Sequence, residues 1–544
     1  MSLVKNQTVR LRIQGYTAEG WGVGRTTEGI AVFVPFAARG DELEVLLVRV
    51  KKQYAFGKIL RIVQPSPARI TPDCPAFGKC GGCDFRHLTY QEELSLKAQR
   101  VQDAMNRIGG FALSLPEIVP SPEIERYRNK AQFPASAEGE AVVFGFYRSR
   151  SHQLIPLKDC KLQSAEACNV AEAVCRWAEE NGVAPYDEQT GSGLLRHIYL
   201  RRGEGGLHLT LVVAADSVPH PELLRARLAR ECPAVCGAVL NCNTAPGNRI
   251  LGERCRTLWG EDRLRDRLAG HEFRLSPLSF YQVNHAQCEQ LYDYAVSLAA
   301  PHPETLALDL YCGVGTITLA LAEHCRAVTG VELVAAAIAD AKENAARNGV
   351  SNVRFLCADA GQAAQALAEE GFAPEVIVVD PPRKGLDQAA IDAICRMQPQ
   401  RIVYVSCDCA SLARDARALA SQAGYQPQKV LAFDMFPRTA NVETVVLLSK
   451  GEIDSKKVRV EFSLEDMDMS DFQDKATYTQ IKDYVLEHSG LKVSNLYISQ
   501  IKRKCGLEVG KNYNLPKAED SRQPQCPSEK ENAIREAMKY FGMI

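Results

Sequence analysis

The chain has 544 residues, of which 46% are hydrophobic and 24% are charged, so it is globular and long enough for three or four domains. Its net charge of −1 excludes a global polycation, so any surface for nucleic acid must be a local patch. There is no apolar run of about 18 residues and no apolar signal segment at the start, which predicts a cytoplasmic protein that does not bind membranes. The nineteen cysteines are therefore expected to be reduced thiols, with any cluster acting as a metal or catalytic site.

Residues 1–65 contain four or five short apolar runs separated by turn residues, which predicts a small β-barrel. This stretch has ten Lys and Arg against five Asp and Glu, a local charge of +5 in a near-neutral protein. Aromatic side chains lie among these cations, and stacking faces beside positive charges suit single-stranded nucleic acid. The alternative is a solvated barrel with the aromatic residues in its core.

Residues 66–270 are predicted to form a β-rich central domain with a cysteine cluster near its start. Cys74, Cys80 and Cys83 are separated by five and then two residues, and two glycines before Cys83 let the loop fold back. Three close thiols need a distant fourth, for which Cys160 is the first candidate and Cys168 the second. Four thiolates hold either zinc or an iron–sulfur cluster, and the residues alone leave that choice open.

Residues 271–450 are predicted to form a Rossmann-like domain organised around residues 306–318. An apolar strand with Asp309 leads into a turn with Gly313 and Gly315 and then a helix, which is typical of a nucleotide pocket. About 20 residues further on, Glu332 ends a second strand, where a carboxylate accepts hydrogen bonds from ribose hydroxyls. The turn lacks the third glycine of dinucleotide sites, which favours S-adenosylmethionine over a pyrophosphate ligand.

Two later strands each end close to an aspartate. Asp359 comes after residues 353–357 and is expected either to meet an adenine amino group or to cap a helix. Asp380 comes after residues 375–379 and precedes Pro-Pro-Arg, where it can read a pyrimidine edge.

Cys407 comes directly after the next strand, residues 401–406. A thiolate that adds to carbon 6 of uracil makes carbon 5 able to attack a methyl sulfonium, and a base must then remove the carbon-5 proton. Glu443, just before the last strand, is the candidate base. A buried structural cysteine and an ordinary strand-start carboxylate are the alternatives.

These motifs together resemble the RNA (uracil-5-)-methyltransferases, over residues 1 to about 450. Residues 20–25 and 30–35 resemble the TRAM domain, an RNA-binding barrel, and residues 74–83 look like the [4Fe-4S] motif of the same family. The resemblance implies Cys407 as nucleophile and Glu443 as base. It implies a cluster on Cys74, Cys80, Cys83 and Cys160, and S-adenosyl-L-methionine bound by Gln282, Asp309, Tyr311, Gly313, Glu332, Asp359 and Asp380.

The presence of both barrel and cysteines favours the members that act on 23S ribosomal RNA, with transfer RNA as the alternative target. A different class, a non-catalytic RNA-binding iron–sulfur protein, also fits the barrel and the cysteines. One departure from the family is Asn441, where its members often carry a titratable histidine. The protein is expected to be a monomer.

Residues 451–544 form an appended segment. An acidic stretch at residues 465–474 is expected to be a linker or exposed loop, and two helices with apolar residues at helical spacing come after it, the second capped by Ser494. Lys502, Arg503 and Lys504 close that helix, which suggests a helix-turn-helix-like nucleic-acid module, and a small α-helical docking domain is the alternative. The predicted fold class is therefore multidomain α/β, with a small, mostly α-helical C-terminal extension.

Overall fold

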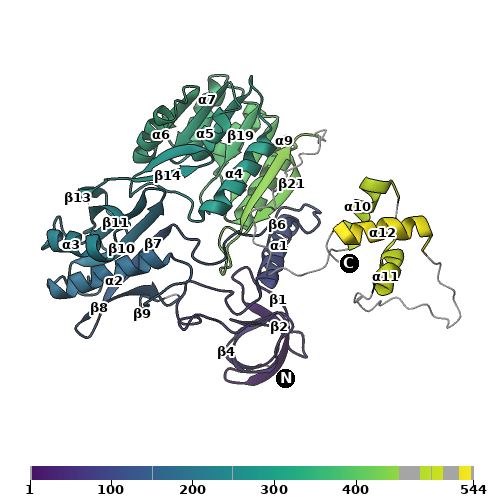
Figure 1. Ribbon diagram of the computed structural model, residues 1–544, viewed down its shortest axis with the longest axis horizontal. Helices are drawn as coiled ribbons and strands as arrows, with labels where there is room; N and C mark the ends of the chain where they lie inside the picture. Colours follow the sequence, from purple (N-terminus) through teal and green to yellow (C-terminus); the bar gives the residue numbers. More distant parts are fainter. Residues whose placement is uncertain are drawn as a thin grey trace. The chain divides into compact units, whose positions relative to one another are not determined.

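The computed structural model describes residues 3–149, 151–247, 249–451, 478–491, 493–505 and 526–540 (Figure 1). The chain divides into two compact units, Met1–Val458 and Arg459–Ile544. The described part of the larger unit holds a barrel and two large sheets, and the described part of the smaller unit is helical.

Five strands close into a barrel at the N-terminus, in the order β1-β2-β3-β5-β4. They are β1 (Thr8–Tyr16), β2 (Gly22–Arg25), β3 (Ala31–Val34), β4 (Glu42–Val50) and β5 (Tyr54–Gln64). Along β4, Leu43, Val45 and Leu47 are buried while the residues between them are partly exposed. This alternation fills the barrel interior with apolar side chains. The predicted N-terminal barrel is confirmed.

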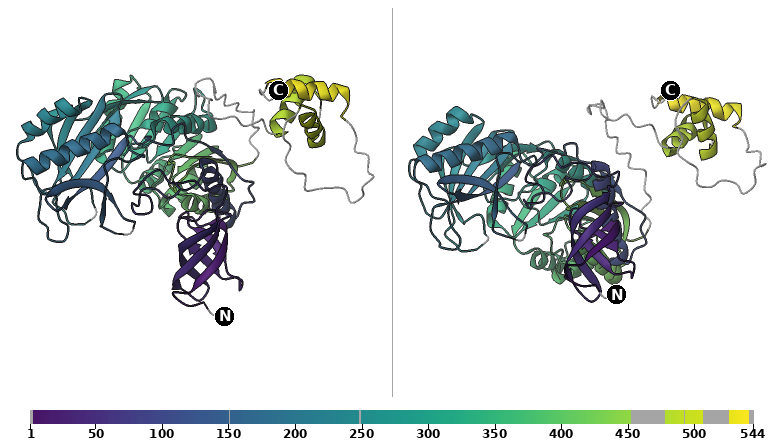
Figure 2. Two further views of the ribbon diagram at one scale, coloured as in Figure 1. Left: turned by 60° about the horizontal axis from the view of Figure 1, so that its bottom comes forward. Right: turned by 90° about the horizontal axis from the view of Figure 1, so that it is seen from below.

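The central sheet has seven strands in the order β13-β12-β11-β10-β7-β8-β9. They are β7 (Lys130–Glu138), β8 (Ala141–Tyr147), β9 (Leu154–Pro156), β10 (Leu195–Gly203), β11 (Gly206–Val213), β12 (Val235–Cys242) and β13 (Arg254–Gly260). Helices α2 (Ala165–Glu180) and α3 (Pro221–Glu231) pack on this sheet (Figure 2). Trp177 of α2 is buried in the shared core.

An eight-stranded sheet forms the third layer of strands, in the order β18-β17-β16-β19-β20-β22-β21-β6. Its strands from the C-terminal half are β16 (Leu306–Leu310), β17 (Ala327–Glu332), β18 (Val353–Cys357), β19 (Val376–Val379), β20 (Arg401–Ser406), β21 (Gln426–Phe433) and β22 (Glu443–Ser449). The first five run parallel, and β22 is antiparallel to β20. A hairpin of β14 (Leu264–Leu268) and β15 (His271–Leu275) precedes the sheet.

Helices cover both faces of the eight-stranded sheet. They are α4 (His285–Ala299), α5 (Thr316–Ala322), α6 (Ala335–Arg347), α7 (Ala360–Glu369), α8 (Gln388–Met397) and α9 (Cys409–Ala423). Val376 and Val378 of β19 belong to the core with α4, α5 and α6, whereas Ile377 and Val379 belong to the core with α7, α8 and α9. Both faces of a parallel strand are thus apolar, which is why these strands read as continuous hydrophobic runs.

Part of the stretch that the sequence groups with the central domain joins the eight-stranded sheet instead. Strand β6 (Glu117–Val119) pairs in parallel with β21, and helix α1 (Tyr90–Arg107) contributes Val101 and Met105 to the core beside α9. Thr89 caps α1 by accepting a hydrogen bond from the Glu92 amide at 3.4 Å. A short strand and a helix placed far upstream in the sequence therefore complete this layer.

Lys97 of α1 is fully buried between two carboxylates. Its Nζ donates to Glu93 Oε1 at 2.7 Å, to Asp434 Oδ1 at 2.6 Å and to the Phe436 carbonyl at 3.1 Å. The Tyr90 hydroxyl donates to the other oxygen of Asp434 at 2.7 Å. Buried charges of this kind are tolerated only as a complete set. The set therefore fixes residues 434–442, named here the 434–442 loop, against α1.

The described part of the second unit contains α10 (Tyr478–Ser489), α11 (Asn495–Lys504) and α12 (Ser528–Tyr540). Ile481, Ile498 and Ile534, one from each helix, are fully buried in one core. Ser494 caps α11 as expected, and the mostly helical extension is confirmed, although α12 was not predicted. The acidic stretch at residues 465–474 lies outside the described residues, and a nucleic-acid role for this unit stays a prediction.

No helix in the described ranges is both long and apolar enough to span a lipid bilayer.

Replacing Lys97 with Met is expected to lower the free energy of unfolding by about 3–5 kcal/mol, because two buried carboxylates lose their shared cation. Urea unfolding followed by tryptophan fluorescence measures this loss. The control is Arg107→Ala at the exposed end of α1, where the ion pair with Asp103 is worth about 0–1 kcal/mol. Equal losses in the two variants would contradict a structural role for the buried set.

Candidate active site

The carboxyl ends of four parallel strands meet at one edge of the eight-stranded sheet. Asp309 and Glu332 lie on β16 and β17, and Asp380 and Cys407 come directly after β19 and β20. Ligands of open parallel sheets bind beyond this edge. The sequence-predicted residues are therefore brought together where a ligand is expected.

Asp309 is a buried carboxyl with one oxygen unused. The Thr318 hydroxyl donates to its Oδ2 at 2.6 Å, while Oδ1 is buried and has no hydrogen-bond partner among the described residues. Burial, with smaller contributions from the nearby carboxyls Asp380 and Glu332, raises the pKa of Asp309 to about 7. A buried oxygen without a partner, at the carboxyl edge of the sheet, is suited to a hydrogen bond with a bound cofactor.

The turn after β16 has an unusual backbone. Tyr311, Gly313 and Gly315 all have positive φ, at 68°, 55° and 85°. Glu332 holds this turn, since its Oε2 accepts from the Gly313 amide at 3.2 Å and its Oε1 accepts from the Val334 amide at 2.9 Å. A Cβ on Gly315 would lie 3.2 Å from the Phe355 ring, so the turn is also close-packed. Because these glycines have no side chain and adopt positive φ, a bound nucleoside could approach the backbone of the turn closely.

Asp359 and Gln282 lie on either side of this turn in the sequence. Asp359 caps α7, because its Oδ1 accepts from the Gly361 and Gln362 amides at 3.1 and 3.2 Å. The capping alternative is therefore observed, and a contact with adenine stays a prediction. Gln282 is buried. Its backbone carbonyl accepts a hydrogen bond from Asn129 Nδ2 at 2.9 Å, which joins the central domain to the site.

Cys407 shares its surroundings with two carboxyls. The thiol is partly exposed, and burial raises its pKa to about 11, with further contributions from Glu443 and Asp380. Glu443 is 1% exposed, and its pKa lies well above the usual range because of burial and because of Asp380. Burial also raises the pKa of Asp380 to about 7. Two desolvated carboxyls next to each other do not both ionise readily.

Arg383 is the cation of this cluster. It interacts with the Cys407 thiol and opposes the carboxyls, lowering the pKa of both Cys407 and Glu443. Its Nη2 also donates to Asn441 Oδ1 at 3.4 Å. Asn441, which replaces the titratable residue expected from the family, therefore acts as a hydrogen-bond acceptor for the guanidinium.

The four predicted cysteine ligands line one cavity of about 290 Å³. Cys74, Cys80, Cys83 and Cys160 contribute to its wall, and Cys168 does not. The Gly82 amide donates to Cys80 Sγ at 3.3 Å. Within the described ranges, however, no three His, Cys, Asp or Glu side chains are arranged so that they could hold a metal ion. The thiols are thus gathered but not in ligating geometry.

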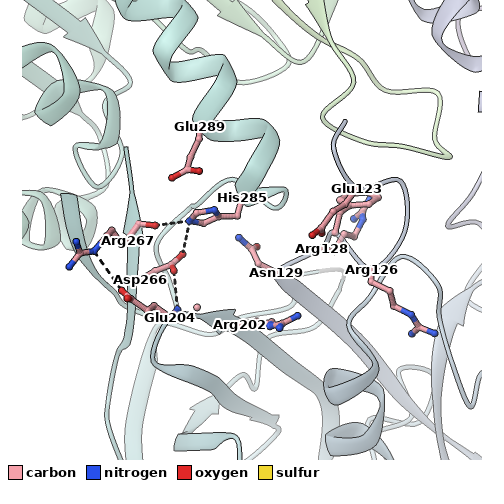
Figure 3. A pocket seen from close by; sticks show the side chains of 12 residues that line it. Glu123, Arg126, Arg128, Asn129, Arg202, Glu204, Asp266, Arg267, His285 and Glu289 are labelled. Carbon is pink, nitrogen blue, oxygen red and sulfur yellow. Dashed lines mark hydrogen bonds and ion pairs between the residues drawn. The ribbon is translucent and has the colours of Figure 1, made fainter. Parts of the chain in front are cut away.

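A second cavity, of about 470 Å³, is lined by Asn129, the hydrogen-bond partner of Gln282 (Figure 3). Figure 3 shows His285 and Asp266 along one wall, with Asn129 and Arg202 across from them. His285 Nε2 lies 3.9 Å from Asp266 Oδ2 and contacts the Arg267 carbonyl at 2.6 Å. The pocket has both basic and acidic walls, and the Asn129 bond to Gln282 connects it to the site.

The parallel sheet, glycine turn and acidic second strand define a Rossmann-like methyltransferase fold. Residues 260–451 match the family model for tRNA (uracil-5-)-methyltransferases, and residues 4–60 match the TRAM domain. Two proteins described as uncharacterized RNA methyltransferases, from Clostridium tetani and Halalkalibacterium halodurans, are each 40% identical over 447 residues, covering 82% of this chain and 97% of each relative.

A solved structure is similar over a comparable share of the chain. It is the Pyrococcus abyssi tRNA (uracil-54, C5)-methyltransferase in complex with S-adenosyl-L-homocysteine, with 28% identity and a TM-score of 0.65, covering 81% of this chain and 99% of that one. The chain belongs to the S-adenosylmethionine-dependent RNA (uracil-5-)-methyltransferase family.

Two groups near the site were not predicted from the sequence. Arg383 was given no role, although its position three residues after Asp380 at a strand end was a usable signal. Asn129, which bonds Gln282, had no such signal, because 153 residues separate the two partners.

Alkylation of Cys407 by iodoacetamide at pH 8 is expected to be slower than that of exposed Cys357, because a pKa of about 11 leaves little thiolate. Glu443→Gln removes a neighbouring negative charge and should speed the reaction several-fold. Arg383→Gln removes the cation and should slow it. Mass spectrometry of the peptides over a pH series measures both effects, and the same pH profile in all three proteins would contradict this electrostatic arrangement.

Proposed function

We propose that this protein methylates carbon 5 of a uridine in 23S ribosomal RNA, with Cys407 as nucleophile and Glu443 as base. The observation that carries the proposal is the grouping of Cys407, Glu443, Asp380 and Arg383 in one cluster at the sheet edge. A non-catalytic RNA-binding protein has no use for such a cluster, which disfavours the binding-only alternative.

In the proposed reaction the Cys407 thiolate adds to carbon 6 of the uracil and makes carbon 5 nucleophilic. S-adenosylmethionine, when bound, supplies the methyl group to carbon 5. Glu443 then takes the carbon-5 proton, and the Cys407–carbon bond breaks to restore the thiolate. Arg383 favours the thiolate form, and an ionised Asp380 is suited to accept a hydrogen bond from the N3–H edge of the base.

For the cofactor we propose Asp309, Tyr311, Gly313, Glu332, Asp359, Asp380 and Gln282 as the surrounding residues. The unpartnered Asp309 Oδ1 and the close backbone at the glycine turn both suit a bound nucleoside. Asp359 uses only Oδ1 for capping, so its second oxygen is available to an adenine amino group.

Ribosomal RNA is proposed as the target because the chain combines the barrel with the four gathered cysteines. A cavity of about 700 Å³ between the barrel and α1 is lined by Arg25, Arg39, Arg100 and Arg107, which suits a phosphate backbone. Transfer RNA is the second candidate. The Pyrococcus abyssi enzyme, named for a transfer-RNA uracil, matches 81% of this chain, so the match extends well beyond the catalytic sheet.

We also propose that Cys74, Cys80, Cys83 and Cys160 hold a [4Fe-4S] cluster. All four thiols line one cavity, and Gly81 and Gly82 line it as well. Burial raises the pKa of Cys83 to about 12, which a bound metal would counter by stabilising the thiolate. The cluster has no part in the proposed reaction.

Wild-type protein incubated with labelled S-adenosylmethionine is expected to place label in 23S ribosomal RNA as 5-methyluridine. Cys407→Ala should lose turnover while still binding cofactor, because no adduct forms at carbon 6. Glu443→Gln should accumulate RNA covalently bound to protein, because the carbon-5 proton stays in place. Nucleoside mass spectrometry, with transfer RNA in parallel, and denaturing gels measure these outcomes.

The matched control is Cys409→Ala, which removes a buried thiol two residues from Cys407 and should keep full activity. Label in transfer RNA alone would keep the mechanism and replace the substrate. Turnover in Cys407→Ala would overturn the mechanism.

Anaerobically purified Cys160→Ser is expected to lose bound iron and sulfide and the broad visible absorbance of a cluster. Cys168→Ser should keep them, because Cys168 does not line the cavity. Analysis of iron, sulfide and zinc per chain measures this. Zinc in place of iron in the wild-type protein would be the result against an iron–sulfur centre.

A further inference from the structure

Residues 74–85, named here the cysteine loop because they include Cys74, Cys80 and Cys83, are hydrogen-bonded directly to the 434–442 loop. The Asp84 and Phe85 amides both donate to the Arg438 carbonyl, at 2.9 and 3.1 Å. In return the Ala440 amide donates to Asp84 Oδ2 at 2.8 Å. Three hydrogen bonds therefore connect the residues immediately after Cys83 with the segment immediately before Glu443.

The 434–442 loop depends on such partners for its shape. Arg438 has φ of 68°, a left-handed conformation that non-glycine residues adopt only when their surroundings impose it. Its amide donates to Glu93 Oε1 at 2.6 Å, and its carbonyl takes the two bonds from the cysteine loop. The backbone amide and the backbone carbonyl of Arg438 are thus both hydrogen-bonded to residues from another part of the chain.

The far end of the loop reaches the reacting groups. Asn441 comes after Ala440, lines the cysteine cavity and accepts the hydrogen bond from Arg383, which in turn contacts Cys407. Glu443 lies three residues beyond Ala440, at the start of β22, and its buried carboxyl is influenced by the charges of Asp380 and Arg383. Glu443 pairs with Phe433 of β21 in the sheet, and the loop that connects these two residues leads directly into the backbone that carries this carboxyl.

We propose that Asp84 is a positioning residue, which through the Ala440 amide holds the 434–442 loop so that Glu443 reaches the carbon-5 proton. The inference rests on the proposed function, because it concerns the step assigned there to Glu443. It gives the cysteine loop a role in the release half of the reaction.

The first test compares Asp84→Ala with Asp84→Asn. Asparagine keeps an oxygen for the Ala440 amide, whereas alanine removes the acceptor. Under single turnover, Asp84→Ala should form the covalent RNA adduct at close to the wild-type rate but release methylated RNA at least about tenfold more slowly, the usual effect of one lost hydrogen bond to a charged group. Asp84→Asn should release RNA near the wild-type rate.

The second test does not depend on turnover. Hydrogen exchange, read by mass spectrometry on the peptide that contains Ala440, should be faster in Asp84→Ala and close to wild type in Asp84→Asn. Asp73→Ala is the control, since Asp73 precedes the first cysteine and pairs with Arg86 and Lys161 instead of the 434–442 loop. It should leave both the exchange and the release rate unchanged.

Adduct formation and release slowed by the same factor, or equal exchange in the two Asp84 variants, would overturn the inference. Failure of the wild-type protein to methylate RNA or form an adduct would instead overturn the proposed function.

Discussion

The structure depends on one buried cation. Lys97 is fully buried and is shared by Glu93 from its own helix and Asp434 from a distant part of the sequence. Because breaking such a set leaves carboxylates uncompensated in the interior, α1 and the 434–442 loop are held together as a unit. The same Glu93 also accepts from the Arg438 amide, so the ionic set extends along the loop.

Several segments converge on this loop. Besides α1 and the cysteine loop, the Tyr127 hydroxyl donates to the Pro437 carbonyl at 3.0 Å, and Asn284 Nδ2 donates to the Met435 carbonyl at 3.2 Å. The loop thus has partners from α1, the central domain and the segment before α4. A connection between two antiparallel strands, usually the most variable part of a sheet, is here one of its most constrained parts.

That constraint matters because Glu443 is the first residue after the loop. Glu443 and Asp380 are desolvated next to each other, which keeps their pKa values high and disfavours a free thiolate at Cys407. Arg383 opposes this effect at close range. The mutual effect of two carboxyls, one cation and one thiol on their pKa values depends on the distances between them, and the loop contributes to these distances because its Asn441 accepts a hydrogen bond from Arg383.

The sequence by itself determined the local helices, strands and turns and many of the residues at the carboxyl edge of the eight-stranded sheet. The barrel strands, the glycine turn and the strand ends at Asp309, Glu332, Asp380 and Cys407 are predictable from periodicity and turn residues, which are short-range properties. Only the tertiary structure decided that β6 and α1 join the eight-stranded sheet, that Lys97 meets Asp434 and that Asp84 meets Ala440. Those partners are 337 and 356 residues apart, and nothing in a local pattern marks a polar residue for a contact at such separation.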